Sequence, residues 1–334
     1  MTGPDTEHTN GHRPAFGLPH EPDPASALST AALVALHAPS VHNTQPWHWR
    51  VGTDRVDLYA DERWRLRVAD PDGRLLVLSC GAALHHARVA LRAMGFLPSV
   101  RRFPDRTRPD LLASLAVDKP IPVTAQALDL MRATTARHTD RRGIADSPVP
   151  ERTLAVLREA AGSEGAWLHL LNDDQVRTVV AAAARAEAVE MGDAAFRREL
   201  DSWTNRPADV TVGIPATVHP PRGDEYSRTG HYAVLYGSGD RPTAWLRAGE
   251  ALSAVWLTAT AHGLAIRPIS AVIEIPAGRA VLHKVLSGVG SPYLMLRIGV
   301  PVGTNGVSMT PRRPAEESVG LLTEPADEAA SEAP

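Results

Sequence analysis

Two segments of this chain, residues 80–96 and 248–264, align without a gap, and this repeat constrains the fold more than any other feature. The identical pairs are Gly81 with Gly249, Ala83 with Ala251, Leu84 with Leu252, Ala93 with Ala261 and Gly95 with Gly263. Both segments have the small-residue, amphipathic pattern of a packed helix and end at a glycine suited to the position after a helix C-terminus. Two alanine-rich helices can match by chance, but paired glycines near both ends favour duplication of one α/β unit.

The length of the chain agrees with two such units. It has 334 residues, and one domain commonly spans about 150. We expect a disordered arm at residues 1–24, a first half at 25–122, a second half at 123–314 and a disordered acidic tail at 315–334. Within the second half, residues 204–239 are dense in Pro and Gly and lack periodicity, which is typical of a disordered segment or a functional lid.

Composition excludes several classes of protein. The net charge of -3 gives no reason to expect nucleic acid or an acidic membrane surface as a partner. Cys80 is the single cysteine, so intramolecular disulfides are excluded and a reducing compartment is favoured. The chain has no run of about 18 apolar residues and no apolar leader near its start, so we expect a cytoplasmic protein without membrane partners.

Local patterns predict several elements between the repeated helices. The alternation in residues 111–117 predicts a strand, and Thr124 is a suitable N-cap for a helix that continues to Arg137. Residues 151–171 have the pattern of a helix, a glycine turn and a strand. A final strand is expected at residues 292–300.

Three common kinds of site are not supported. Pro39 and Pro46 interrupt the histidine-containing segment 37–48, so the helical pairing of metal ligands is impossible there and no metal site is expected. The glycines at 237–239 and 288–290 lack the rest of a dinucleotide-binding fingerprint. Ser79 lacks the G-x-S-x-G context of a hydrolase nucleophile.

Two other stretches have the chemistry of a ligand site. "APSVHNTQPWHWRV" (residues 38–51) combines amides, hydroxyls and aromatic residues around a proline, and the question is whether it forms a structural turn or a ligand-binding loop. "RHTDRR" (137–142) offers guanidinium groups and a hydroxyl that suit phosphate oxygens. The alternative for this stretch, and for "PRRP" (311–314), is a solvated basic turn.

Together these stretches resemble the nitroreductase superfamily of FMN proteins. "RHTDR" resembles the family motif R-x-S-x-R/K, with Thr in place of Ser, and "PSVHNTQPW" resembles its P-S-x-x-N-x-Q-P-W loop. "GLAIRPIS" resembles a later segment, with Ser270 and Ala271 where many members have Glu-Gly beside the flavin N5. The residues that the resemblance assigns to flavin binding are Arg137, His138, Thr139, Arg141, Pro39, Ser40, Asn43, Gln45, Ser270, Ala271, Arg312 and Arg313.

The order of these motifs is similar to that of the Acg family, whose members are fused double-domain FMN proteins. The loop at 39–47 comes first without an arginine motif before it, and the arginine motif comes later without an intact loop after it; residues 160–171 hold a degenerate counterpart. The resemblance implies an α+β, nitroreductase-like fold in which two fused halves form an intramolecular pseudo-dimer around one FMN. A monomer and a homodimer of such chains both remain open.

The resemblance also implies a function. Hydride would pass from NADH or NADPH to flavin N5 and then to a nitroaromatic or quinone-like acceptor. Arg137, Arg312 and Arg313 would hold the phosphate, Arg141 would stabilise the reduced flavin, and the loop residues would bind the ribityl chain and ring edge. No proton-transfer residue is evident. The alternative is a lid-covered protein that sequesters or stores FMN with little reductase activity. Trp47 and Trp49 are expected to be packing residues.

Overall fold

The computed structural model describes residues 23–139, 144–204, 230–303 and 310–322, and these form a mixed α and β structure. Its strands are β1 (Trp47–Val51), β2 (Arg55–Ala60), β3 (Phe96–Arg102), β4 (Leu111–Pro120), β5 (Trp167–Leu170), β6 (His231–Gly237), β7 (Ala265–Ile269), β8 (Ser291–Gly299) and β9 (Val319–Leu321). They form a five-stranded sheet of order β3-β4-β2-β1-β9 and a four-stranded sheet of order β5-β6-β8-β7. All neighbouring pairs are antiparallel except β1 with β9, which is parallel.

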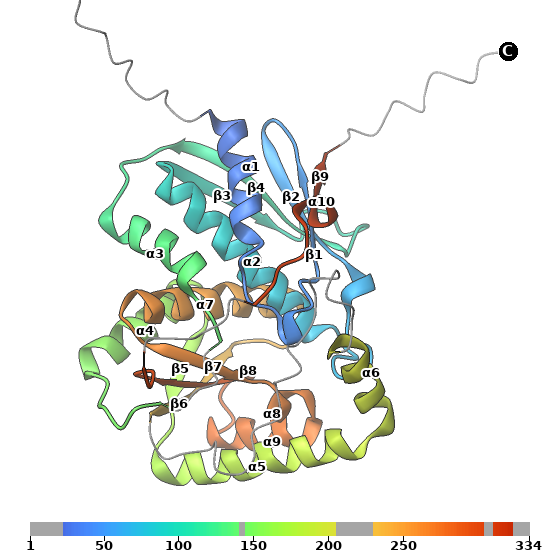
Figure 1. Cartoon of the computed structure of the whole chain (residues 1–334), viewed down its shortest axis with the longest axis vertical. Coiled ribbons are helices and arrows are strands. Elements are labelled where there is room, and N and C mark those ends of the chain that lie inside the picture. The colour runs from blue at the N-terminus through green and yellow to red at the C-terminus, as the bar shows by residue number, and fades with distance from the viewer. Residues whose placement is uncertain (1–22, 140–143, 205–229, 304–309, 323–334) are drawn as a thin grey trace, which may run out of the picture.

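Helices separate and cover these sheets. They are α1 (Pro24–Ala35), α2 (Arg74–Ala93), α3 (Ala125–Ala136), α4 (Glu151–Ser163), α5 (Asp173–Gly192), α6 (Ala194–Thr204), α7 (Pro242–Ala261), α8 (Ala271–Glu274), α9 (Pro276–Val285) and α10 (Ala315–Ser318), with short 3-10 turns η1 (Val41–Asn43) and η2 (Glu62–Trp64). In Figure 1, α2 and α7 cross the middle of the molecule, between one sheet above and the other below. Of the described helices, none is long and apolar enough to cross a membrane.

The two repeated helices, α2 and α7, pack directly against each other. A Cβ added at Gly81 would overlap the carbonyl oxygen of Leu246, and a Cβ added at Gly249 would overlap that of Leu78. Leu78 and Leu246 occupy matching positions in the two copies, so the contact is reciprocal, as a two-fold relation requires. The glycines let the two helix backbones approach closely, because any larger residue would meet main-chain atoms.

At the same contact, each of the two helices contributes a leucine to the hydrophobic core of the opposite half. Leu246 of α7 is fully buried in the core cluster of the first sheet, and Leu78 of α2 is buried in the cluster of the second. Trp47 and Trp49 of β1 are fully buried in the first cluster, which confirms them as packing residues. Each such side chain contributes roughly 2–3 kcal/mol by leaving water, so neither core is complete without the other half.

Most predicted elements are confirmed. The strand expected at 111–117 is β4, the one expected at 292–300 is β8, and Thr124 caps α3 by accepting from the Ala127 N–H. Helix, turn and strand follow in 151–171 as α4, Gly165 with a φ of 78°, and β5. Gly95 and Gly263 also have positive φ, of 84° and 70°, after the ends of α2 and α7.

Two expectations about irregular segments are wrong in part. Residues 231–237, inside the expected lid, form β6, a central strand of the second sheet, because their apolar residues are buried between β5 and β8. Residues 315–321, in the expected disordered tail, form α10 and β9, because the backbone of β9 completes the edge of the first sheet beside β1. Thr204 ends α6, and Asp23 and Pro24 of the expected arm cap and begin α1, whereas residues 1–22, 205–229 and 323–334 lie outside the described residues.

Candidate functional site

The loop from Pro39 to Pro46 lies where α1 ends and β1 begins. Its backbone is unusual, because His42, Asn43 and Gln45 have φ values of 46°, 58° and 50°. Three residues other than glycine in the left-handed region store strain that the surrounding structure must compensate, which is typical of binding sites. Ser40 stabilises the turn, since its hydroxyl accepts from the Gln45 N–H at 2.9 Å.

The C-terminal segment fixes this loop from the other side. The Asn43 side chain donates to the Pro311 carbonyl at 3.0 Å, and the Gln45 side chain accepts from the Arg313 N–H at 2.9 Å. These contacts span 268 residues of sequence. A segment that follows the second sheet therefore shapes a loop that belongs to the first.

Arg137 and Arg312 meet at the C-terminal end of α1. Both donate to the His37 carbonyl oxygen, Arg137 at 3.4 Å and Arg312 at 3.1 Å. The guanidinium of Arg137 also stacks over the ring of Trp256, 4.6 Å from its centroid. We call Arg137, Arg312 and the His37 carbonyl the arginine cluster.

The arginine cluster holds positive charge that the described residues do not neutralise. Arg137 is only 4% exposed, and within the described part of the chain neither arginine pairs with a carboxylate. The Nε atoms of both are buried without a hydrogen-bond partner. Burial, together with the charge of Arg312, lowers the pKa of Arg137 to about 9, and burial lowers the pKa of Arg312 to about 10.

Capping of α1 alone does not account for this arrangement. A helix C-terminus does attract cations, by up to about 2 kcal/mol in partly buried positions. Two unit charges about 6 Å apart, however, repel each other by roughly 3 kcal/mol at an effective dielectric constant of 20. A guanidinium also has five N–H groups, and Arg137 uses one of them on the described residues. The spare donors and unpaired charge suit an anion.

Arg313 does not belong to the arginine cluster, contrary to expectation. Its guanidinium nitrogens donate to Glu317 and to the Gln45 carbonyl, and it lies 4.0 Å from the ring centroid of Trp64. With these partners Arg313 holds the C-terminal segment on the loop at 39–46. The adjacent arginines of "PRRP" therefore have different partners.

The other residues expected at the site lie at different distances along the chain from the arginine cluster, and one of them is not described. Pro39, Ser40, Asn43 and Gln45 adjoin the arginine cluster through the loop and His37. His138 and Thr139 follow Arg137 as half-buried residues, with His138 Nδ1 3.1 Å from the Ala136 carbonyl. Arg141 lies outside the described residues.

Ser270 and Ala271 lie at the start of α8, and among the described residues no hydrogen bond links them to the arginine cluster. The Ser270 side chain instead hydrogen-bonds to Glu274. Burial raises the pKa of Glu274, and burial with the nearby Glu274 raises that of Glu190. These two carboxyl groups therefore favour sharing a proton.

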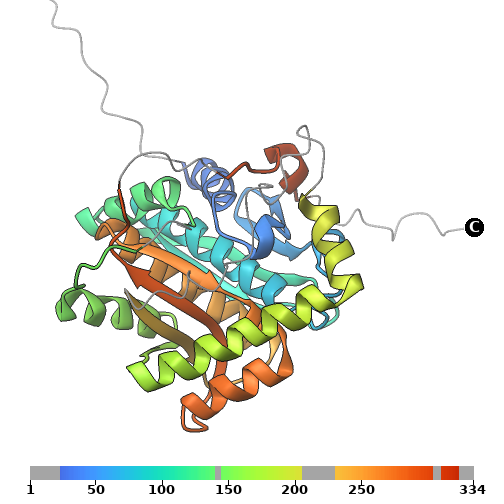
Figure 2. The ribbon, with the colours of Figure 1, turned by 60° about the horizontal axis from the view of Figure 1, so that its bottom comes forward.

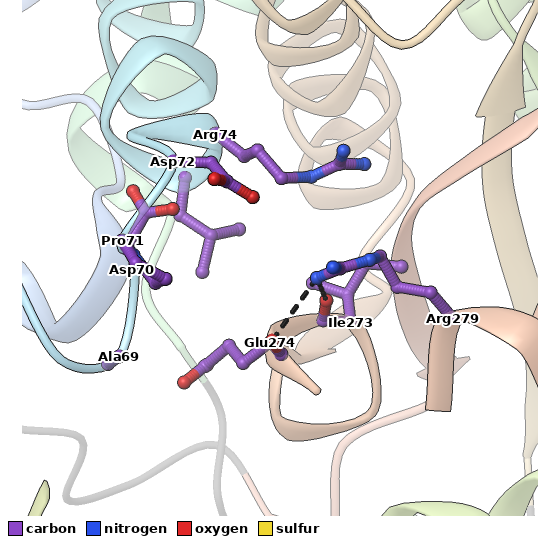
Figure 3. A pocket seen from close by; sticks show the side chains of 9 residues that line it. Ala69, Asp70, Pro71, Asp72, Arg74, Ile273, Glu274 and Arg279 are labelled. Carbon is purple, nitrogen blue, oxygen red and sulfur yellow. Dashed lines mark hydrogen bonds between the residues drawn. The ribbon is translucent and has the colours of Figure 1, made fainter. Parts of the chain in front are cut away.

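A pocket between the start of α2 and α8 contrasts with the arginine cluster (Figure 3). Arg74 pairs with Asp240, and Arg279 donates to the carbonyls of Ile273 and Glu274. In the close-up the Glu274 carboxyl points away from Arg279. Because the cations of this pocket already have partners, it is a poorer anion site than the arginine cluster.

Sequence reasoning missed Trp256, His86 and the His37 carbonyl. Trp256 could have been noticed as a break in the repeat, since the matching residue of the first copy is Arg88. His86 is fully buried in α2 with its Nε2 atom unpartnered. No group of three or more potential metal-ligating side chains occurs among the described residues.

Comparisons with known proteins give relatives over nearly the whole chain. A protein of Mycobacterium tuberculosis named "Putative NAD(P)H nitroreductase Rv3131" is 36% identical over 338 residues, covering 94% of this chain and 96% of that protein. Another, named "Putative NAD(P)H nitroreductase acg", is 30% identical over 312 residues, covering 87% of this chain and 94% of its own. No protein-family model matches the chain.

Solved structures of lower similarity also match. The FMN-dependent nitroreductase NfnB from Mycobacterium smegmatis, in complex with NADPH, has a TM-score of 0.42 and 18% identity, covering 59% of this chain and 100% of that one. A nitroreductase with bound FMN from Bacteroides fragilis has a TM-score of 0.37 and 15% identity, covering 61% and 97%.

Proposed function

Since the chain belongs to the nitroreductase family that includes these Mycobacterium tuberculosis relatives, we propose that it is an FMN-dependent NAD(P)H oxidoreductase whose flavin phosphate binds at the arginine cluster. The observation that carries the proposal is two guanidinium groups, of the buried Arg137 and the half-buried Arg312, whose Nε atoms have no hydrogen-bond partner and which have no carboxylate partner among the described residues. The hydride donor in this proposal is NADH or NADPH, because the relatives are named NAD(P)H nitroreductases. The acceptor is a small nitroaromatic or quinone-like molecule.

The residues present fit a phosphate group. A guanidinium presents a planar fork of N–H groups that matches two phosphate oxygens. Arg137 approaches from the end of α3, and Arg312 from the C-terminal segment, so a phosphate between them would contact both. A dianion between the two guanidinium groups would attract both of them and offset their mutual repulsion.

The loop at 39–46 would hold the rest of the cofactor. Ser40 accepts one hydrogen bond from the Gln45 N–H, so its hydroxyl proton is available to an oxygen or nitrogen of a ligand. Asn43 and Gln45 are engaged by Pro311 and Arg313, which makes them residues that orient the loop. When bound, FMN would supply the capacity to accept hydride from a nicotinamide and deliver electrons to the acceptor.

The experiment is a titration of the purified protein with FMN and with riboflavin, which lacks the phosphate. Changing both Arg137 and Arg312 to Met should weaken FMN binding at least about 100-fold, since hydrogen bonds to charged groups each contribute roughly 1.5–3 kcal/mol. Riboflavin binding should change little. Arg158→Met is the matched control, because that arginine is exposed on α4 and pairs with Glu151.

Equal loss of FMN and riboflavin binding in the double variant would indicate general damage to the fold, and unchanged FMN binding would contradict the phosphate assignment. Turnover is tested separately by anaerobic mixing with NADH and with NADPH while the flavin absorbance is followed. Rapid bleaching by either nicotinamide supports the oxidoreductase.

One observation favours a second candidate, a protein that holds FMN without efficient turnover. Helix α6 of the second half is fixed on the first half (Figure 2). The Glu199 carboxylate accepts from the N–H groups of residues 67–69 at 2.6 to 3.2 Å, and Trp203 packs on Trp64 with ring centroids 5.8 Å apart. Trp64 is also the ring beneath Arg313. If both nicotinamides leave the bound flavin oxidised, this candidate replaces the first.

A further inference from the structure

His86 lies in the interface between α2 and α7, and only one of its two ring nitrogens has hydrogen-bond partners among the described residues. Its Nδ1 is 3.0 Å from the Ala82 carbonyl and 3.0 Å from the Ser253 hydroxyl. The same hydroxyl is 2.8 Å from Nδ1 of His85. The other ring nitrogen of His86, Nε2, is fully buried and has no hydrogen-bond partner among the described residues.

The Ala82 contact favours the tautomer of neutral His86 with the proton on Nδ1, because a carbonyl oxygen can only accept. In this tautomer Nδ1 donates to Ala82 and Nε2 has a lone pair. The Ser253 hydroxyl is then free to donate to His85. Protonation of His86 would leave all these contacts intact, because Nδ1 remains a donor. The only change would be a new N–H group at Nε2.

His86 and Arg137 contact the same face of α7. Ser253, which contacts His86, and Trp256, on which Arg137 stacks, are three residues apart and therefore neighbours on one helix face. The charges of Arg137 and Arg312 also act on the His86 ring. His86 therefore lies on the same face of α7 as Arg137 and within the electrostatic field of the arginine cluster.

We propose that His86 is a third phosphate-binding residue, which takes up a proton at Nε2 when the flavin phosphate enters the arginine cluster. The proposal rests on the proposed function, in which that cluster binds the phosphate. The proton comes from solvent and forms the N–H bond that donates to a phosphate oxygen. It returns to solvent when the cofactor leaves.

The charges around His86 explain why the proton arrives with the ligand. Burial, then the charges of Arg137 and His85, and lastly that of Arg312 lower the pKa of His86 well below 6.5. A phosphate dianion would offset the positive charges of Arg137 and Arg312, which removes their share of the lowering of the His86 pKa and favours the imidazolium.

The other elements packed on His86 supply little compensating charge. Among the described residues, α1 has no ionisable side chain. Two acids of this interface, Glu250 and Glu164, are paired with Arg88, and Glu250 is also bound by Arg102. The ligand is thus the anion that would bring a proton to His86.

The test is calorimetric titration of FMN into the whole protein near pH 8, in two buffers of different ionisation enthalpy. The wild-type protein should take up about one proton for each FMN bound, and its affinity should rise by up to about tenfold for each pH unit of acidification. His86→Asn retains a donor near Ala82 but lacks Nε2, so it should bind FMN about tenfold more weakly and take up no proton.

Two controls separate the possible outcomes. Riboflavin should bind without proton uptake in either protein. His262→Asn should behave as wild type, because His262 makes a similar contact to the carbonyl of Thr258 but is exposed at the end of α7. FMN binding that depends on Arg137 and Arg312 but involves no proton uptake would overturn the His86 proposal alone. Failure of FMN to bind would overturn the proposed function itself.

Discussion

Trp256 and Arg88 occupy matching positions in the two copies of the repeated helix, yet their surroundings are opposite. Over Trp256 lies Arg137, a buried cation with no carboxylate partner among the described residues. Arg88 instead donates to Glu164 at 2.6 Å and to Glu250 at 2.8 Å. The charge of Arg137 has no acid beside it among the described residues, whereas that of Arg88 is neutralised by two.

The origin of this difference lies in two acids of the second half. Glu164 belongs to residues 160–171, which the sequence predicted as a degenerate counterpart of the loop at 39–47. Glu250 corresponds to Ala82 of the first copy, so only one copy of the helix has an acid there, and it binds both Arg88 and Arg102. Acids thus neutralise the arginine on one side of the α2–α7 contact, whereas the described residues supply none to Arg137 on the other.

The largest expected effect comes from removing the internal counter-ion. Burial acts to lower the pKa of Arg88, but Glu250 and Glu164 outweigh it and raise that pKa. Glu250→Gln should therefore lower the free energy of unfolding by about 3–5 kcal/mol, because Arg102 loses its buried carboxylate partner and Arg88 keeps only Glu164. Urea denaturation measures this change. Glu151→Gln, at an exposed acid, should cost less than about 1 kcal/mol; equal losses in both variants would contradict the comparison.

A second variant tests the reciprocal contact that the two halves share. Gly81→Ala should lower the free energy of unfolding by about 2–3 kcal/mol, because the new Cβ would overlap the Leu246 carbonyl. Gly249→Ala should have a similar effect through Leu78 if the two-fold relation holds. Gly162→Ala on α4 is the control, since no atom lies within 4 Å of the added Cβ; it should stabilise the protein by up to about 1 kcal/mol. Thermal and urea unfolding report all three.

The smallest effect has the opposite sign and concerns the open side. Arg137→Met should raise the free energy of unfolding of the protein without cofactor by about 1–2 kcal/mol, because it removes a buried charge whose pKa is already lowered to about 9. The same variant should lose affinity for FMN. Arg132→Met, on an exposed residue of the same helix, should change neither quantity. A destabilised Arg137→Met protein would show that this arginine is structural.

Much of the architecture could be predicted from the sequence. The paired glycines of residues 80–96 and 248–264 predicted two equivalent helices, and their reciprocal contact is present in the structure. Thr124, Gly95 and Gly263 marked helix ends correctly, because caps depend on local backbone geometry. The motif at 137–142 directed attention to Arg137.

Other features depended on contacts that no local pattern records. The strand β6 was not predicted, because the prolines and glycines before it obscured a short apolar run. The strand β9 was not predicted either, because its three residues pair only with β1, which is distant in the sequence. Arg313 was assigned to the phosphate with Arg312, although its partners are Glu317, Gln45 and Trp64.

The sequence by itself determined the repeat, the family and most helix ends, since these depend on neighbouring residues and on periodic burial. Only the tertiary structure decided which arginines remain unpaired, because charge balance depends on side chains brought together across as many as 275 residues. His86 illustrates the difference. In the sequence it is one of two adjacent histidines in a helix, and the fold places it on the same face of α7 as Arg137, within the field of Arg137 and Arg312.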